Sequence, residues 1–326
     1  MVEFHPQNLF VTGVDPEVLQ AQQAVNQAIA RMPHANLRTP EGLIALRAST
    51  APPQPAPVLK PIDLTMRGPG GDMRLHVFTP QAPVRAIFLR IHGGGWVSGA
   101  PEDDEALNDQ IARKCGVVVV SPEYRLAPEV TIRDQIDDCV AAAQWIGAEA
   151  ERRFGASAVL VGGCSAGSHL AAATVLRLRD AKDRVFPRIV ATHLDCGLYD
   201  LSGSPSVRAA DDRALILTPD WILSFFELGL PGLTAEGRRD PSVSPLYADL
   251  ADLPPALLTV GALDPLRDDS LFLSARWQAA GSGASVDVWP EGGHAFTNMG
   301  TPLSALALER TTGWLTKALA RAKSRI

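Results

Sequence analysis

Short apolar runs alternate with helix-length amphipathic segments from Leu59 onward, and this alternation constrains the fold more than any other feature of the sequence. The apolar runs are Arg74–Thr79, Arg85–Ile91, Val117–Val120, Ala158–Val161, Arg188–Leu194, Ala256–Val260 and Val286–Trp289. The candidate helices are Glu102–Cys115, Ile132–Glu149, Ser165–Asp180, Asp268–Ala280 and Ser304–Ala320. Parallel strands need long crossovers, usually helical. We therefore expect an α/β fold with a mostly parallel central sheet and helices on both faces.

The first fifty or so residues do not share this alternation. Asp15-Pro16 is typical of a helix start, and apolar residues recur at helical spacing until Pro33. A second short helical stretch follows, and then five prolines between Pro52 and Pro61 predict a linker. We interpret residues 1–55 as an N-terminal helical segment.

The alternation also lapses between Asp200 and Asp240. Thr218-Pro219 predicts a helix that ends near Gly229 and carries Trp221 and Phe225 on a wide apolar face. We expect this insertion, at about 200–240, and the N-terminal helices to form a helical cap over the carboxyl ends of the strands, where open α/β sheets bind ligands. Ordinary core packing is an equal alternative for any one of these aromatic residues.

Composition narrows the class of protein. Of 326 residues, 46% are hydrophobic and 20% charged, which suits a globular chain with a large core. The net charge is −6 without a basic run, so we expect no nucleic-acid partner. No stretch reaches the roughly 20 apolar residues of a membrane span, and residues 1–13 lack a secretory pattern. Four dispersed cysteines indicate buried thiols in a reducing compartment, so we expect a cytoplasmic protein.

A G-x-S-x-G motif, Gly163 to Gly167, lies between a candidate strand and a candidate helix. In this context the motif is typical of a nucleophile elbow, where a tight turn needs glycine on both sides and raises the central serine above the strand end. We predict that Ser165 is the nucleophile and that the neighbouring Cys164 is a buried structural thiol. A glycine-rich strand-to-helix turn without a catalytic role is the alternative interpretation, but it does not explain the other candidate site residues described next.

A serine nucleophile needs a base, and the base needs an acid that orients it. Asp264 follows the run that ends near Val260, and His294 follows the run that ends at Trp289. The chain order Ser, Asp, His, with the last two after strand ends, is the order of a catalytic triad in an α/β fold. Asp195 and Asp200 are weaker candidates for the acid because they follow an earlier strand.

The segment His92-Gly93-Gly94-Gly95-Trp96 follows another apolar run. Consecutive glycines allow the backbone to approach a substrate and to aim amide groups at one point. We predict that the amides of Gly94 and Gly95, together with that of Ala166, bind the oxyanion of a tetrahedral intermediate. Trp96 ends this loop.

These motifs together resemble the hormone-sensitive-lipase-like branch of the α/β-hydrolases, also called bacterial esterase family IV. The resemblance runs from about Leu59 to the C-terminus, and further motifs that carry it are Tyr124–Glu129, Asp137-Asp138, Asp240-Pro241, Ser244–Leu246, Leu253–Ala256 and Asp264–Asp268. It implies an α/β-hydrolase catalytic domain over residues 56–326, the triad and oxyanion roles given above, and no cofactor or metal. It also implies hydrolysis of small-molecule carboxylic esters with short to medium acyl chains, and a possible homodimer.

Several positions depart from the family pattern. Cys164 replaces the usual Asp or Thr before the nucleophile, and Ser168 replaces the usual Gly after the elbow. For substrate contact we predict Trp96, Trp221, Phe225 and Phe296. Two alternatives remain open: an amide or formamide hydrolase similar to arylformamidases, and a catalytically silent relative that binds a ligand in the capped pocket.

Overall fold

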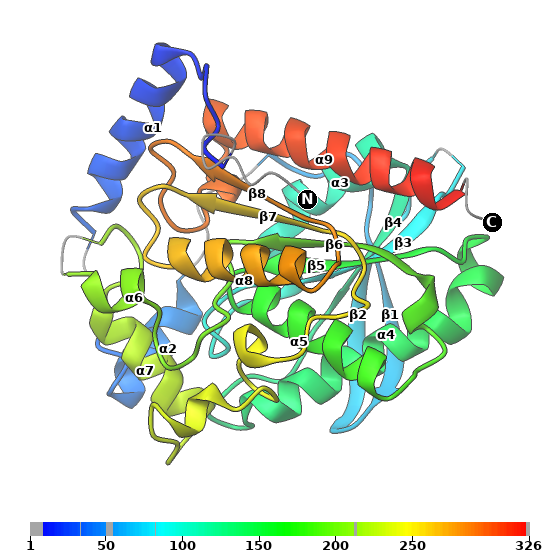
Figure 1. Cartoon of the computed structure of the whole chain (residues 1–326), viewed down its shortest axis with the longest axis horizontal. Coiled ribbons are helices and arrows are strands. Elements are labelled where there is room, and N and C mark those ends of the chain that lie inside the picture. Colours follow the sequence, from blue (N-terminus) through cyan, green and yellow to red (C-terminus); the bar gives the residue numbers. More distant parts are fainter. Residues whose placement is uncertain (1–8, 33, 50–54, 82, 212–213, 324–326) are drawn as a thin grey trace.

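An eight-stranded sheet forms the centre of the computed structural model, which describes residues 9–32, 34–49, 55–81, 83–211 and 214–323 (Figure 1). Within these residues the strand order is β1-β2-β4-β3-β5-β6-β7-β8. The strands are β1 Ile62–Gly68, β2 Gly71–Phe78, β3 Ala86–Ile91, β4 Val117–Pro122, β5 Val159–Cys164, β6 Ile189–Asp195, β7 Ala256–Gly261 and β8 Ala284–Trp289. Neighbours from β4 to β8 pair in parallel, while β1, β2 and β4 pair antiparallel. The predicted mostly parallel α/β sheet is confirmed.

Helices cover both faces of this sheet. The α-helices are α1 Pro16–Ile29, α2 Pro40–Ala48, α3 Glu105–Cys115, α4 Ile132–Phe154, α5 Ala166–Asp180, α6 Pro205–Ala209, α7 Pro219–Gly229, α8 Arg267–Ala279 and α9 Pro302–Lys323. Short 3₁₀ turns are η2 Pro101–Asp104, η3 Phe186–Arg188, η4 Gly237–Arg239, η5 Pro245–Tyr247 and η6 Phe296–Asn298. Helices α3 and α9 pack together on one face, and α4, α5 and α8 lie on the other (Figure 1).

The two-sided cover explains why the central strands are apolar throughout. In β4, Val117 and Val119 belong to the core beneath α3 and α9, whereas Val118 and Val120 belong to the core beneath α4 and α5. All four side chains are fully buried. A strand with one solvated face would alternate with polar residues instead, so the continuous runs in the sequence report burial on both faces.

Strand β1 was missing from the predicted strands. It is an edge strand that pairs with β2 through a tight turn between Gly68 and Gly71. Its side chains are mostly exposed, and Asp63 and Arg67 interrupt its apolar residues. An edge strand with so little burial leaves no apolar run, which is why the sequence pattern did not reveal it.

The N-terminal region and the insertion meet each other. Helix α7 begins where predicted: the Thr218 hydroxyl accepts a hydrogen bond from the Trp221 amide, and proline occupies the first helical position. The Trp221 indole donates to the Ala35 carbonyl at 2.7 Å, and Arg38 pairs with Asp220 at 3.0 Å. Helix α1 instead packs against α9. Part of the predicted proline linker, Pro52 and Pro53, lies outside the described residues.

Over the part of the chain that the structure describes, no helix combines the length and the apolar character needed to cross a membrane.

Candidate active site

Ser165 lies in a sharp turn between β5 and α5. Its backbone is in the sparsely populated positive-φ region, with φ 55° and ψ −122°. Such strain persists only where the surroundings enforce it and clusters at functional sites. A Cβ on Gly163 would lie 2.5 Å from the Ile91 carbonyl oxygen, and one on Gly167 would lie 2.1 Å from the same atom. The two glycines therefore allow β3 and the turn to approach each other closely.

Ser165, His294 and Asp264 form one hydrogen-bonded chain. The Ser165 hydroxyl lies 2.9 Å from His294 Nε2, and His294 Nδ1 lies 3.0 Å from Asp264 Oδ2. The other Asp264 oxygen accepts the Leu266 amide at 2.8 Å, which fixes the carboxylate within its turn. Asp264 and His294 follow β7 and β8 respectively, and both are buried. This arrangement can remove a proton from the hydroxyl and hold the resulting imidazolium against a carboxylate.

The glycine loop after β3 lies against the nucleophile turn. A Cβ on Gly93 would lie 3.1 Å from the Cys164 carbonyl oxygen. Gly94 and Gly95 have φ of 110° and 60°, a region that favours glycine. Of the three residues predicted to bind the oxyanion, Gly95 and Ala166 line the same cavity as Ser165, and Gly94 is not among the described residues that line it. Gly94 turns the loop, because its carbonyl accepts the amides of Val97 and Ser98.

Scaffold residues beneath this loop fix its shape. The Tyr124 hydroxyl donates to the His92 carbonyl at 3.0 Å, and the two rings stack 4.2 Å apart. Burial lowers the pKa of His92, whose Nδ1 faces the Gly93 carbonyl at 2.9 Å. Arg125 makes a two-pronged ion pair with Asp138, with both contacts at 2.8 Å. These contacts give Tyr124, Arg125 and Asp138 a supporting role.

An apolar cavity with about 20 Å³ of free volume opens beside Ser165. Besides the loop and turn residues, its walls are Trp96, Leu198, Leu217, Ile222, Phe225, Phe226 and Leu266. A cavity of this size holds a group only a little larger than one water molecule. Helix α7 supplies the wall opposite the glycine loop, since a Cβ on Gly95 would lie 2.6 Å from the Phe225 ring.

The four aromatic residues predicted to contact substrate differ in their position relative to the cavity. Trp96 and Phe225 line the cavity, and the Trp96 indole donates to His169 Nδ1 at 3.2 Å. Trp221 and Phe296 are absent from the cavity lining among the described residues. Trp221 packs edge-on against Phe225 and holds α7 to the N-terminal segment.

Phe296 lies apart from the cavity beside Ser165, so its substrate contact stays a prediction. Its side chain is fully buried among Trp289, Leu303 and Ala307, where it packs under the loop that carries His294. Burial of the ring against apolar neighbours accounts for an aromatic residue at this position without any contact to a ligand. Proximity to His294 in the sequence was the basis of that prediction.

The two unusual neighbours of the nucleophile are both buried. The Ser168 hydroxyl lies 2.6 Å from the Gly163 carbonyl and 2.8 Å from that of Asp195, so it ties the start of α5 to the ends of β5 and β6. The Cys164 sulfur lies 3.6 Å from the Cys196 sulfur. The pKa of Cys164 is raised, with the hydrogen bond to Cys196 opposing the effect of burial. Neither thiol is poised as a thiolate nucleophile, in agreement with the assignment of Ser165.

Asp195, a weaker candidate for the triad acid, has a separate position. Its Oδ2 accepts the Thr297 hydroxyl at 2.5 Å, and its backbone carbonyl accepts the Ser165 amide at 2.8 Å. Its other carboxylate oxygen has no partner among the described residues. Burial raises the pKa of the Asp195 carboxyl to about 6, while the Thr297 bond and the charges of Arg90 and His294 oppose this shift. Asp195 thus joins the nucleophile turn to the segment after His294.

A second buried carboxylate supports the same segment. Asp104, at the end of η2, accepts a 2.7 Å hydrogen bond from Asn298 and pairs with the fully buried Arg90 at 2.5 Å. No sequence pattern predicts these contacts, because Arg90, Asp104 and Asn298 come from three separate segments. A charged residue inside the otherwise apolar run of β3 was the available signal that buried partners exist.

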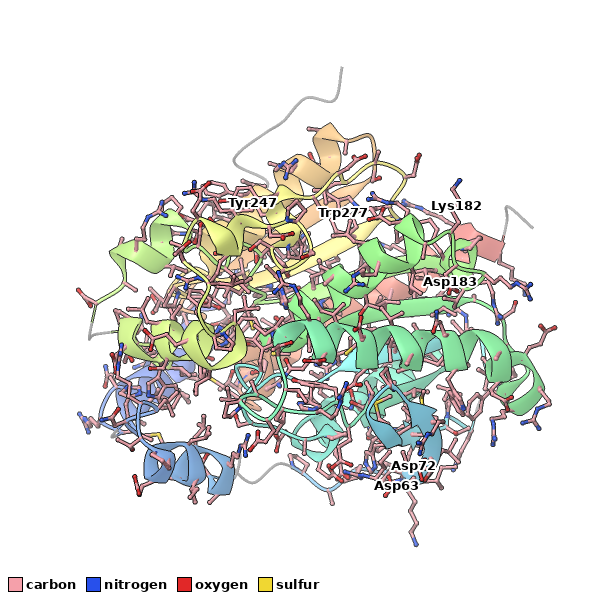
Figure 2. All side chains as sticks on the ribbon, turned by 90° about the horizontal axis from the view of Figure 1, so that it is seen from below. Asp63, Asp72, Lys182, Asp183, Tyr247 and Trp277 are labelled. Atoms are coloured by element: carbon pink, nitrogen blue, oxygen red, sulfur yellow. The ribbon has the colours of Figure 1, made fainter. Side chains whose placement is uncertain are left out.

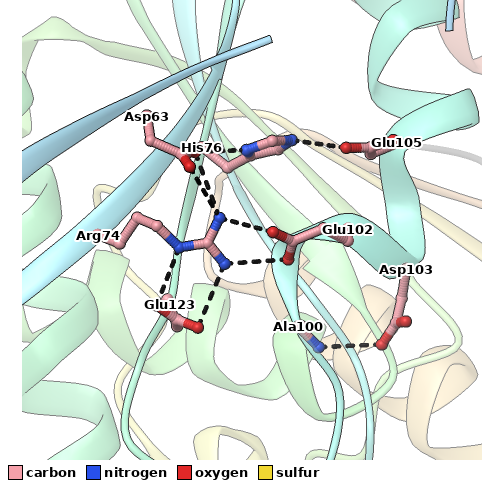
Figure 3. Close-up of polar contacts among 8 residues, drawn as sticks. All are labelled: Asp63, Arg74, His76, Ala100, Glu102, Asp103, Glu105 and Glu123. Atoms are coloured by element: carbon pink, nitrogen blue, oxygen red, sulfur yellow. Dashed lines mark hydrogen bonds and ion pairs between the residues drawn. The ribbon is translucent and has the colours of Figure 1, made fainter.

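Turn η2 is itself held to the sheet by a charge cluster (Figure 3). Arg74 on β2 contacts Glu102 at 2.6 Å and Glu123 at 3.0 Å, and Asp63 at 3.3 Å. His76 lies between Asp63 and Glu105, at 2.7 and 2.9 Å. The side-chain hydrogen bond from Arg74 lowers the pKa of Glu102. The cluster fixes the segment that leads from the glycine loop into α3.

Comparison with known proteins shows the family of the chain. Residues 88–298 match a family model described as the alpha/beta hydrolase fold. The chain is 32% identical over 286 residues to the esterase LipI of Mycobacterium tuberculosis, covering 82% of this chain and 83% of LipI. It is also 32% identical over 285 residues to the carboxylesterase NlhH of the same organism, covering 84% and 88% of the two chains.

Solved structures give the same result. A hyperthermophilic esterase from Pyrobaculum calidifontis superposes with a TM-score of 0.78 at 26% identity, covering 94% of this chain and 99% of the other. An esterase from the bacterial hormone-sensitive lipase family superposes with a TM-score of 0.76 at 26% identity, covering 94% and 100%. The chain belongs to the α/β-hydrolase family, in the branch of esterases similar to hormone-sensitive lipase.

Proposed function

We propose that this carboxylesterase cleaves its substrates through Ser165, with His294 as the base and Asp264 as the acid that orients it. The observation that carries the proposal is the continuous chain of hydrogen bonds from Ser165 through His294 to Asp264, at 2.9 and 3.0 Å. Asp195 is the alternative acid. Its carboxylate accepts the Thr297 hydroxyl, and among the described residues it makes no hydrogen bond to the His294 ring.

The reaction has two halves. His294 accepts the Ser165 proton as Oγ attacks the ester carbonyl, and the amides of Gly94, Gly95 and Ala166 stabilise the oxyanion. The protonated His294 then gives its proton to the departing alcohol. Water attacks the acyl-enzyme with His294 again as base, which releases the acid and restores Ser165. Asp264 stays ionised and stabilises the imidazolium in both halves.

The acyl group occupies the apolar cavity beside Ser165. A free volume of about 20 Å³ leaves room for the methyl end of an acetyl group but not for a longer chain. Longer acyl chains require the side chains of α7, above all Phe225, to move away from Gly95. We therefore assign a preference for short acyl esters, with α7 and the N-terminal helices as a cap over the site.

Two further assignments belong with this proposal. A reducing location such as the cytoplasm suits four cysteines without a disulfide among the described residues. For a homodimer we assign the edge strand β8 as the interface, because its outer edge pairs only with a short segment around Phe10 in the described chain. Sedimentation analysis of the purified protein measures the oligomeric state directly.

Hydrolysis of p-nitrophenyl acetate tests the triad. We expect Ser165→Ala to lower kcat by about 10⁶-fold and Ser242→Ala, an exposed serine, to leave it unchanged. We expect Asp264→Asn to lower kcat by about 10⁴-fold, far more than Asp195→Asn. A larger loss in Asp195→Asn would transfer the acid role to Asp195. Equal rates on matched ester and anilide substrates would contradict the preference for esters.

A further inference from the structure

Cys196 lies directly beside the proposed acid and base. Its sulfur, one carboxylate oxygen of Asp264 and one ring nitrogen of His294 lie within 4.8 Å of one another, and all three residues are buried. Cys196 follows the end of β6, where its backbone has a φ of 43° and its amide donates to the Thr259 carbonyl at 2.7 Å. Thiolate, imidazole and carboxylate are the three side-chain ligand types that zinc binds in proteins.

The spacing of these atoms is close to what a tetrahedral ion requires. Two ligand atoms about 2.0 to 2.1 Å from zinc lie about 3.4 Å apart, and His294 Nδ1 lies 3.0 Å from Asp264 Oδ2. A sulfur at about 2.3 Å from the ion would lie about 3.5 Å from either atom. The Cys196 sulfur lies within 4.8 Å of both, so it needs to approach them by no more than about 1.3 Å. Two sulfurs on one zinc lie about 3.8 Å apart, and Cys164 is 3.6 Å from Cys196. Cys164 or a water molecule therefore provides a fourth ligand.

We propose that Cys196, Asp264 and His294 form an inhibitory site for a thiophilic divalent cation such as Zn²⁺ or Cd²⁺. The inference rests on the proposed function, because the acid and the base of that mechanism are two of the three proposed ligands. The ion competes with catalysis rather than assisting it. It is not a cofactor, and the mechanism above runs without it.

The chemistry of inhibition follows from the two ring nitrogens. In the resting base the proton lies on Nδ1, toward Asp264, and Nε2 is free to accept the Ser165 proton. The cation takes the Nδ1 lone pair, so the ring proton moves to Nε2, and the Cys196 thiol loses its proton to solvent as its sulfur binds the ion. An imidazole with a proton on Nε2 cannot accept the one from Ser165. Acylation stops until a chelator removes the ion.

The sequence pattern could not reveal this site. Its members lie at positions 196, 264 and 294, and the spacing between them matches no local metal motif. Only the topology, which places β6, β7 and β8 side by side with their carboxyl ends together, brings them to one place.

Cadmium titration monitored by ultraviolet absorbance tests for the ligand, since a cadmium–thiolate bond gives a charge-transfer band whether or not the enzyme turns over. The proteins are wild type, Cys196→Ala, Cys196→Ser and the control Cys139→Ala, which removes a fully buried thiol from α4. All are kept reduced with a phosphine. We expect the band to saturate at one equivalent of Cd²⁺ per chain in wild type and in Cys139→Ala. We expect the band to be lost in both Cys196 variants.

Zinc inhibition of esterase activity supplies the second readout, with each variant compared with its own activity in chelator. Loss of even an outer-shell partner costs a metal site about 10- to 100-fold in affinity. We therefore expect the half-inhibitory Zn²⁺ concentration to rise at least about tenfold in both Cys196 variants and to stay unchanged in Cys139→Ala. Excess chelator should restore wild-type activity.

Three results would overturn the inference: a cadmium band that persists in both Cys196 variants, equal zinc sensitivity of wild type and the variants, or inhibition that a chelator does not reverse. Failure of the proposed function is distinguishable, because a wild type without esterase activity would still be tested through its cadmium band. The Ser variant keeps a small polar side chain at the position, so a folding defect confined to the Ala variant leaves the comparison intact.

Discussion

The buried carboxyl of Asp195 predicts an unusual dependence of stability on pH. Burial raises its pKa from 3.8 to about 6, so the folded protein binds this proton more tightly than the unfolded chain. A group of this kind contributes stability that is fully present below pH 3.8 and is lost as the pH rises through about 6. The whole shift corresponds to about 3 kcal/mol, and about 1.4 kcal/mol of it falls between roughly pH 5 and pH 7.5 by the same linkage relation.

Asparagine at this position cannot ionise and still accepts the Thr297 hydroxyl. We expect the free energy of unfolding of Asp195→Asn, relative to wild type, to increase by about 1.4 kcal/mol on going from about pH 5 to about pH 7.5. Urea denaturation at both pH values measures this difference. The matched control is Asp72→Asn, an exposed carboxylate on the β1–β2 hairpin (Figure 2), for which we expect no such change. A constant or decreasing difference for Asp195→Asn would refute the reasoning.

Two further predictions concern the cavity and the charge cluster. Phe225→Ala enlarges the acyl cavity, so the kcat/KM ratio of hexanoate to acetate esters should rise about tenfold; an unchanged ratio would remove Phe225 from the cavity wall. Arg74→Met leaves its three carboxylate partners without a shared cation and should destabilise the fold by about 1 to 2 kcal/mol in low salt. Because Arg74 lowers the pKa of Glu102, that loss should shrink as the pH falls below the usual Glu pKa of 4.5. Arg67→Met, with an exposed ion pair, is the control, and an equal loss there would contradict a special role for the cluster.

The fold class followed from patterns that burial imposes on the sequence. Strands covered by helices on both faces are apolar along their whole length, as in β4, and such runs are visible without a structure. Strand β1 was not predicted because its side chains are mostly exposed, so it has no continuous apolar run. Helix α7 was bounded correctly because its start depends on local chemistry, a threonine cap followed by proline.

The site was partly predictable for a similar reason. The nucleophile turn is a local motif, and the positions of Asp264 and His294 follow from chain order and strand ends; their catalytic roles stay predictions. Contacts between distant segments were not accessible, as with Asp195 and Thr297 or Cys196 and Asp264. For Phe296, nearness to His294 in the sequence was the basis of a predicted substrate contact that stays a prediction, and the ring packs in the core.

The central claim is that Ser165 Oγ is the nucleophile that becomes acylated. Covalent labelling tests this claim most directly. Wild type, Ser165→Ala and Ser242→Ala are treated with a fluorophosphonate, and the modified peptide is identified by mass spectrometry. We predict one adduct per chain, on Ser165, in wild type and in Ser242→Ala, and none in Ser165→Ala. An unlabelled wild type, an adduct on another residue such as Cys164, or equal labelling of Ser165→Ala would contradict the account.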